Sequence, residues 1–350
     1  MTTKTPVRFV SYSGMSMASF RYRTLIPVQG LESLGYDAKI CKADSEIKPG
    51  VYIFSKHFNP KEEYNLLKKL QDPEFVIGNV THTIAGEEDA GSVIIFDICD
   101  NHFGNSELAN YYKTMIGKAD IVVAATGKMA DIVKKECREE LGEKPIVVIS
   151  DPYEFPEKEP RFNWQQQEVE NLLWYGHPTN IKHLQRIWND IGDHNLMIIT
   201  QAGTKLDVDG VPFPVVPYSI DSLLWGFSQC DVVIIPNDGM DSAKGANRII
   251  EAIRQGIFVV AEPCPAYQEF DKFMYIGNIK EGLKWCKANK GEIQGRIQKA
   301  QDHIREKYAP KQITEQWSKL IKEAVEIKSS RLPQEKSEKA PCGLEEVAAK

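Results

Sequence analysis

Two short apolar runs flank one amphipathic helix between residues 231 and 270, and this arrangement constrains the fold more than any other part of the chain. The runs DVVIIP and IFVVA are bounded by polar or turn-forming residues, as is typical of strands inside a parallel sheet. The helix between them is expected to begin near Asp241 or Ser242, either of which can cap its first N–H groups. A strand, a helix and a second strand in this order predict an α/β fold with a parallel sheet.

The rest of the chain repeats this alternation in two halves. The first half predicts a doubly wound parallel sheet from the apolar runs VRFVSY, VYIFSK, EFVIGNV, SVIIFDIC, DIVVAAT and IVVIS. The segment DPYEFPEKEPRF, rich in proline and charge, follows, and the second half restarts with NLLWYGH, LMIIT and PVVPY. We therefore expect an N-terminal domain over 1–150, a linker over 151–165, a C-terminal domain over 166–309, a closing helix over 310–328 anchored by Trp317, and a disordered tail over 329–350.

Composition excludes several classes of protein. With 350 residues, 42% of them apolar, the chain can bury two cores without disulfides or metals. The seven cysteines are scattered and form no C-x-x-C pair, so neither a zinc site nor a disulfide framework is indicated. This usage favours a cytoplasmic location, and we find no apolar run or leader that predicts a membrane span or secretion. The net charge of −6 disfavours a general nucleic-acid binder, and the lack of G-x-G-x-x-G and Walker A patterns disfavours dinucleotide and NTPase sites.

Polar side chains form one stripe on the helix that follows DVVIIP. Lys244, Asn247, Arg248 and Glu251 recur at the spacing of a single helix face, and ligands of open α/β sheets bind where such a helix starts. Its N-terminus suits an anion such as a diphosphate, which Lys244 and Arg248 can neutralise while Glu251 accepts hydrogen bonds from sugar or ribose hydroxyls. Gly245 lets a ligand approach the backbone closely. The alternative is a solvated face with an ion pair between Arg248 and Glu251.

The segment AKGANRIIEAIRQGIFVVA resembles the donor-binding helix of GT-B glycosyltransferases, in the large and mostly retaining nucleotide-sugar-dependent group (family 4, group 1 type). The resemblance implies two Rossmann-like domains that face each other across a cleft, with no metal and no tightly bound cofactor. It implies transfer of a sugar, with retention, from a nucleotide-diphosphate-sugar donor to a glycan, a protein, a small molecule or a modified nucleic-acid base. It also implies that Glu251 contacts the donor ribose. The chain departs from the common E-x7-E pattern, because Ala243 stands where the first glutamate is expected.

Two first-half segments match acceptor-side positions of that group. In SYSGMSMASFRYR, Gly14 allows close approach to a helix end, and Arg21, ahead of Arg23, is a candidate for binding phosphate. Asp100 and His102 follow a predicted strand, and the resemblance implies acceptor or sugar contacts, with His102 nearest the reacting centre. With Asp97 they also have the chemistry of a divalent-metal site, although turn hydrogen bonds explain the Asp100 region equally well.

In the second half, the resemblance assigns donor-diphosphate contacts to Gly176, His177, Asn180 and Lys182, and base contacts to the region of Tyr218. A plain strand–helix turn is the alternative for the first of these segments. The candidate catalytic residues are thus His102, Asp100, Lys244 and Glu251. Two other functions stay open, namely a non-catalytic GT-B-like binding subunit and a GT-B nucleotide-sugar epimerase.

Overall fold

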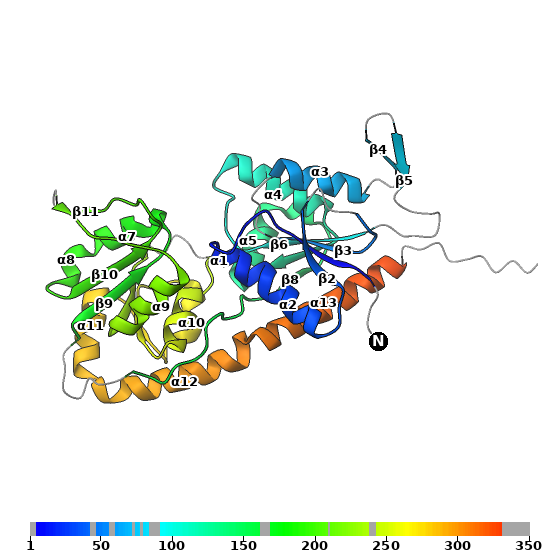
Figure 1. The fold of residues 1–350 in the computed structure, drawn as a ribbon. Helices are drawn as coiled ribbons and strands as arrows, with labels where there is room; N and C mark the ends of the chain where they lie inside the picture. The colour runs from blue at the N-terminus through cyan, green and yellow to red at the C-terminus, as the bar shows by residue number, and fades with distance from the viewer. Residues whose placement is uncertain are drawn as a thin grey trace, which may run out of the picture.

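Two parallel six-stranded sheets, each surrounded by helices, form two domains that lie beside each other (Figure 1). The computed structural model describes residues 5–42, 47–55, 60–71, 74–77, 80–83, 92–161, 169–208, 211–237 and 243–330. None of the helices in these ranges is long and apolar enough to cross a membrane. The expected α/β fold with two Rossmann-like halves is confirmed.

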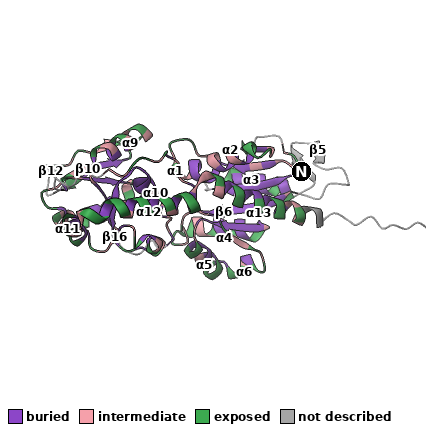
Figure 2. Cartoon of the chain, turned by 90° about the horizontal axis from the view of Figure 1, so that it is seen from below, coloured by how far each residue is buried: buried purple, intermediate pink, exposed green. Residues whose placement is uncertain are grey.

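The N-terminal sheet has the strand order β2-β1-β3-β6-β7-β8, and all its neighbouring strands are parallel. Its strands are β1 (Val7–Val10), β2 (Ala38–Cys41), β3 (Val51–Ser55), β6 (Val93–Ile98), β7 (Ile121–Ala124) and β8 (Ile146–Val148). Its helices are α1 (Ala18–Phe20), the π-helical η1 (Arg21–Leu25), α2 (Ile26–Ser33), α3 (Pro60–Gln71), α4 (Ser106–Lys118), α5 (Gly127–Glu136) and α6 (Arg138–Leu141). Separate apolar clusters fill the two faces of this sheet, so its inner strands β3, β6 and β7 are buried throughout (Figure 2).

The C-terminal sheet has the order β13-β10-β9-β14-β15-β16 and is also parallel. Its strands are β9 (Asn171–Tyr175), β10 (Asn195–Thr200), β13 (Val216–Pro217), β14 (Val232–Ile235), β15 (Phe258–Ala261) and β16 (Tyr275–Ile276), with a small ribbon of β11 (Asp207–Val208) and β12 (Val211–Pro212). Its helices are η2 (Pro178–Asn180), α7 (Ile181–Arg186), α8 (Trp188–Ile191), α9 (Ile220–Gln229), α10 (Asn247–Arg254), η3 (Pro265–Phe270), α11 (Ile279–Ala288) and α12 (Lys290–Tyr308). One continuous apolar cluster holds these elements together.

The last helix, α13 (Pro310–Ser330), returns from the C-terminal domain to the N-terminal one (Figure 1). Trp317 is fully buried there, and its ring meets that of Phe9 edge-on at 5.4 Å. The helix therefore closes the apolar face of the N-terminal sheet. The exact domain limits stay predictions, and residues 331–350 of the expected disordered tail lie outside the described residues.

Several local expectations are wrong. The run EFVIGNV does not enter the main sheet: β4 (Glu74–Ile77) pairs with β5 (Val80–Thr83) in a separate antiparallel ribbon. The donor-side helix begins at Asn247, not near residue 241, because residues 243–246, which precede it, are not helical. The expected caps Asp241 and Ser242 lie outside the described residues. The edge strand β2 is missing from the predicted set, since its two middle residues are exposed and its sequence AKIC lacks an apolar run.

Candidate functional site

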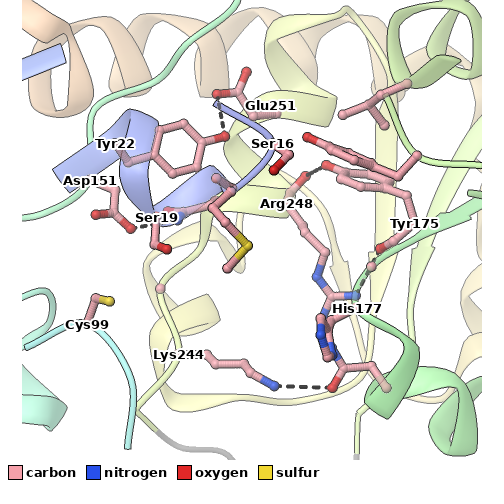
Figure 3. Close-up of a pocket in the computed structure, with 18 of the residues that line it drawn as sticks. Ser16, Ser19, Tyr22, Cys99, Asp151, Tyr175, His177, Lys244, Arg248 and Glu251 are labelled. Atoms are coloured by element: carbon pink, nitrogen blue, oxygen red, sulfur yellow. Dashed lines mark hydrogen bonds between the residues drawn. The ribbon is translucent and has the colours of Figure 1, made fainter. Parts of the chain in front are cut away.

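A cavity of about 670 Å³ lies between the two domains, near the carboxyl ends of strands from both sheets (Figure 3). The N-terminal domain lines it with residues 16–19, 22 and 23 and with Cys99 and Asp100 after β6. The C-terminal domain contributes the loops after β9 and β10, Tyr218 and the start of α10, and the linker adds Asp151 and Phe155. This is where ligands of open α/β sheets bind, and the size suits a small molecule.

Two cations of the C-terminal domain face this cavity beside the start of α10. Lys244 donates from Nζ to Oδ1 of Asn180 at 3.3 Å, and Arg248 donates from Nη1 to the carbonyl of Tyr175 at 3.4 Å. The helix starts after Ala246 with no side-chain cap, so its N–H groups and positive dipole end lie next to both cations. This wall of the cavity has the chemistry of an anion site.

Residues 243–246, just before α10, include Lys244, and this segment is anchored to the N-terminal domain at Ala243. Thr126 donates from its hydroxyl to the carbonyl of Ala243 at 3.1 Å, and Ala243 is buried among apolar residues of the N-terminal domain. The position of the first glutamate of the E-x7-E pattern is therefore a buried domain contact.

Glu251 lies deeper in the same cavity and is only 3% exposed. Its Oε1 accepts from the backbone N–H of Glu154 at 2.8 Å and from the Tyr22 hydroxyl at 3.3 Å, and Oε2 accepts weakly from the N–H of Phe155 at 3.4 Å. Burial raises the pKa of this carboxyl to about 7. The alternative ion pair of Arg248 with Glu251 is not what the two side chains form, because each is bonded to backbone groups instead.

A buried polar chain crosses between the domains at Asp151. Its Oδ1 accepts from Arg23 Nη1 at 3.1 Å, and its Oδ2 accepts from Asn247 Nδ2 at 2.6 Å. Arg23 is fully buried, donates from Nε to Asp97 at 2.9 Å and also donates to the carbonyl of Ile149 at 2.6 Å. Asp97 thus neutralises an arginine inside the N-terminal domain.

The structure brings most of the predicted residues to one cavity. Its lining includes Asp100, Gly176, His177, Asn180, Tyr218, Lys244, Asn247, Arg248 and Glu251. Cβ atoms would fit poorly at Gly176, where one would lie 3.3 Å from the Trp174 ring and 3.5 Å from Arg248 Nη1. The contact with Trp174 is tighter than usual and that with Arg248 is an ordinary one, so a side chain at this position would press mainly on the Trp174 ring.

Four predicted residues do not line the cavity. Gly14 is exposed in the loop before α1, and Lys182 is exposed on α7. His102 packs its ring against Tyr112, with centroids 5.9 Å apart. Arg21 is buried and bonds to Glu154, to the carbonyl of Met15 and to the Tyr218 hydroxyl, so its guanidinium stabilises the domain interface.

Sequence reasoning missed Tyr22, Asp151 and Cys99 as cavity residues. In the sequence, Tyr22 looks like an apolar residue of a helix and Asp151 like a polar residue of the linker. The residues around them therefore do not indicate a binding site. Cys99 directly precedes Asp100 at the end of β6, where its position alone indicates the site.

Comparison with protein-family models and with curated protein sequences finds no match. Solved structures do match. HepE from Anabaena in complex with UDP superposes with a TM-score of 0.60 at 10% identity, over 91% of this chain and 100% of that one. TarM gives a TM-score of 0.55 at 15% identity over 78% of this chain, which spans only 54% of TarM. An alpha-glucosyltransferase in complex with UDP and a 13-mer DNA gives 0.50 at 10% identity, over 91% of this chain and 100% of that one.

These neighbours are GT-B glycosyltransferases, and the chain has their two-domain GT-B fold. The recognition of this fold from the donor-helix sequence is confirmed. At these identities the likeness defines the fold, while the activity depends on the cavity itself.

Proposed function

We propose that the protein is a glycosyltransferase that takes a sugar from a nucleotide-diphosphate donor bound in the interdomain cavity. One observation carries the proposal: Lys244, Arg248 and the open start of α10 border the same cavity as the buried carboxylate of Glu251. The fold that this chain shares with HepE holds UDP and UDP-glucose in solved complexes of HepE, and cations beside an open helix N-terminus suit the diphosphate of such a ligand. UDP is therefore the first nucleotide to test.

In this proposal each wall has a chemical task. Lys244, Arg248 and the helix dipole stabilise the diphosphate that leaves as the anomeric bond breaks. Glu251 accepts hydrogen bonds from the ribose hydroxyls, and Asp100, on the opposite wall of the cavity, contacts the acceptor substrate. Because the donor helix resembles that of a mostly retaining group of enzymes, the proposal includes transfer with retention of the anomeric configuration. The acceptor is not identified.

Ala243 favours a second candidate function. A buried alanine replaces the carboxylate that relatives use near the donor sugar, so a non-catalytic subunit that binds a nucleotide sugar fits this position as well. A nucleotide-sugar epimerase is the third possibility. The three differ in what happens to the donor: transfer, binding alone, or conversion without an acceptor.

The experiment is thermal unfolding of the wild type, Lys244→Ala and Glu251→Ala with UDP, GDP, ADP, TDP and CMP. At a hundred times its dissociation constant, one nucleotide should add about 2.7 kcal/mol of stability to the wild type and clearly less to either variant. Lys284→Ala is the matched control, because this exposed lysine lies on α11 and pairs with Glu281 one helical turn before it. No shift with any nucleotide would refute the donor site. Donor hydrolysis measured on the binding nucleotide sugar then separates an enzyme from a binding subunit.

A further inference from the structure

Tyr22 of the N-terminal domain reaches across the domain interface to the carboxylate of Glu251. Tyr22 belongs to the π-helical turn η1, a distortion that is frequent at functional sites. Its side chain lines the cavity although the residue is only 6% exposed, and its hydroxyl donates to Oε1 of Glu251 at 3.3 Å (Figure 3). Burial and the nearby carboxylate raise the pKa of this phenol well above its ordinary value, so the hydroxyl keeps its proton and acts as a donor.

Glu251 is enclosed from two sides. The backbone N–H groups of Glu154 and Phe155 approach it from the linker, and Tyr22 approaches it from the cavity wall. With 3% of its surface exposed, the carboxylate has little room for a further donor while all three contacts are made. The linker contacts are made by backbone groups that are fixed by the chain path, whereas the tyrosine contact can be replaced.

The residues on either side of Tyr22 hold it in this position. Arg21 donates to the Tyr218 hydroxyl at 3.0 Å, on the C-terminal wall of the cavity, and also pairs with Glu154. Arg23 pairs with Asp151, which accepts in turn from Asn247 at 2.6 Å. Three consecutive residues of η1 are therefore connected to groups that border the cavity.

We propose that the Tyr22 hydroxyl holds the place of a ribose hydroxyl on Glu251, so that a nucleoside diphosphate binds only after Tyr22 has left the carboxylate. The inference rests on the proposed donor site. Both groups are O–H donors, and Oε1, which also accepts from the N–H of Glu154, has one lone pair left for either of them. Tyr22 is thus an internal competitor of the donor, and it covers the carboxylate while the cavity is empty.

The experiment is calorimetric titration of UDP into the wild type and Tyr22→Phe, which removes only the hydroxyl. Loss of one competing hydrogen bond should tighten UDP binding by about threefold to tenfold. The gain should disappear for 2′,3′-dideoxyuridine diphosphate, which lacks the hydroxyls that replace the tyrosine. Tyr36→Phe is the matched control, because the Tyr36 hydroxyl bonds to Ser318 on α13 and neither residue lines the cavity.

Each outcome decides a different point. Tighter UDP binding in Tyr22→Phe alone supports the competition. If UDP binds the wild type and Tyr22→Phe binds it equally or more weakly, the inference is overturned, because the hydroxyl then contributes nothing or contacts the ligand directly. If UDP binds neither protein, the inference has no ligand to act on and the proposed UDP donor fails with it. An equal gain for the dideoxy nucleotide overturns the ribose assignment.

Discussion

At the scale of single residues, the environment of Glu251 makes its protonation part of the stability of the protein. Burial is the largest cause that raises the pKa of this carboxyl from 4.5 to about 7, the Glu154 carboxylate acts in the same direction, and the N–H groups of Glu154 and Phe155 lower it. The folded state thus binds this proton more tightly than the unfolded chain. The resulting stabilisation is fully present below pH 4.5 and is lost as the pH rises through about 7.

We expect Glu251→Gln to remove this pH dependence. The free energy of unfolding of the wild type, measured relative to the variant, should fall by on the order of 3 kcal/mol between pH 4.5 and 8. Denaturant titrations of both proteins at several pH values measure the difference, in which all other titrating groups cancel. Curves that stay parallel over this range would show that the carboxyl titrates normally in the folded state.

The sequence could predict single residues only where they follow a strand end or lie on one helix face. Asp100, Gly176 and Arg248 are such residues, and all three line the cavity. Tyr22 and Asp151 could not be found in this way, because their partners Glu251 and Asn247 are distant in the sequence. Arg21 is of a residue type that binds phosphate, but its contacts with Glu154 and Tyr218 depend on how the two domains pack against each other.

At the scale of elements, the packing of α13 on α2 depends on a glycine. A Cβ built at Gly30 would lie 2.0 Å from Oγ1 of Thr314 and 2.9 Å from its Cβ, so the two helices are too close for any side chain there. Gly30→Ala gains about 1 kcal/mol of helix propensity but must separate the helices. We expect a net loss of about 1–3 kcal/mol of stability, measured by denaturant unfolding.

Gly295 supplies the control, because it also lies inside a helix, α12, and a Cβ there meets nothing within 4 Å. Gly295→Ala should stabilise the protein by up to about 1 kcal/mol. Adding Thr314→Ala to Gly30→Ala should recover part of the loss, since it removes the two nearest atoms. Equal effects of the two glycine substitutions would contradict the close packing of α2 and α13.

Elements were predictable where burial makes a continuous apolar run, as in β6, β14 and β15. The strands β2 and β16 escaped prediction because an edge strand needs few apolar residues and a two-residue strand has no pattern. The apolar run of β4 looks like a strand of the main sheet, yet β4 pairs with its sequence neighbour β5 in a separate ribbon. Its composition does not distinguish these two kinds of pairing.

At the scale of the whole molecule, the chain passes between the domains at two neighbouring points. The N–H of Tyr153 donates to the carbonyl of Tyr308 at 3.0 Å, and this hydrogen bond connects the two segments in which the chain crosses between the domains. Beyond Tyr153 the linker is bonded to the C-terminal domain, through Lys158 to Arg254 and through Arg161 to Gly256. Beyond Pro310 the chain packs on the N-terminal domain. We therefore expect residues 149–152 and 308–310, where the chain crosses, to act as the hinge in any movement between the domains.

Asp151 lies at this hinge and is the carboxylate that connects Arg23 of one domain with Asn247 of the other. Asp151→Ala should cost about 1–3 kcal/mol of stability, and not more, because Arg23 keeps its ion pair with Asp97. It should also weaken the contact between the domains, so that the radius of gyration measured by small-angle X-ray scattering increases.

Asp37→Ala is the matched control for this change. It also removes an arginine partner, since Asp37 pairs with Arg8 at 2.8 Å, but both residues belong to the N-terminal domain and Asp37 is well exposed. Its scattering should therefore match that of the wild type. An unchanged radius of gyration in Asp151→Ala would mean that Ala243, Tyr22 and Arg21 hold the domains together without the hinge carboxylate. A change that UDP reverses would connect the closure of the hinge to the occupancy of the cavity, because Asn247 borders both.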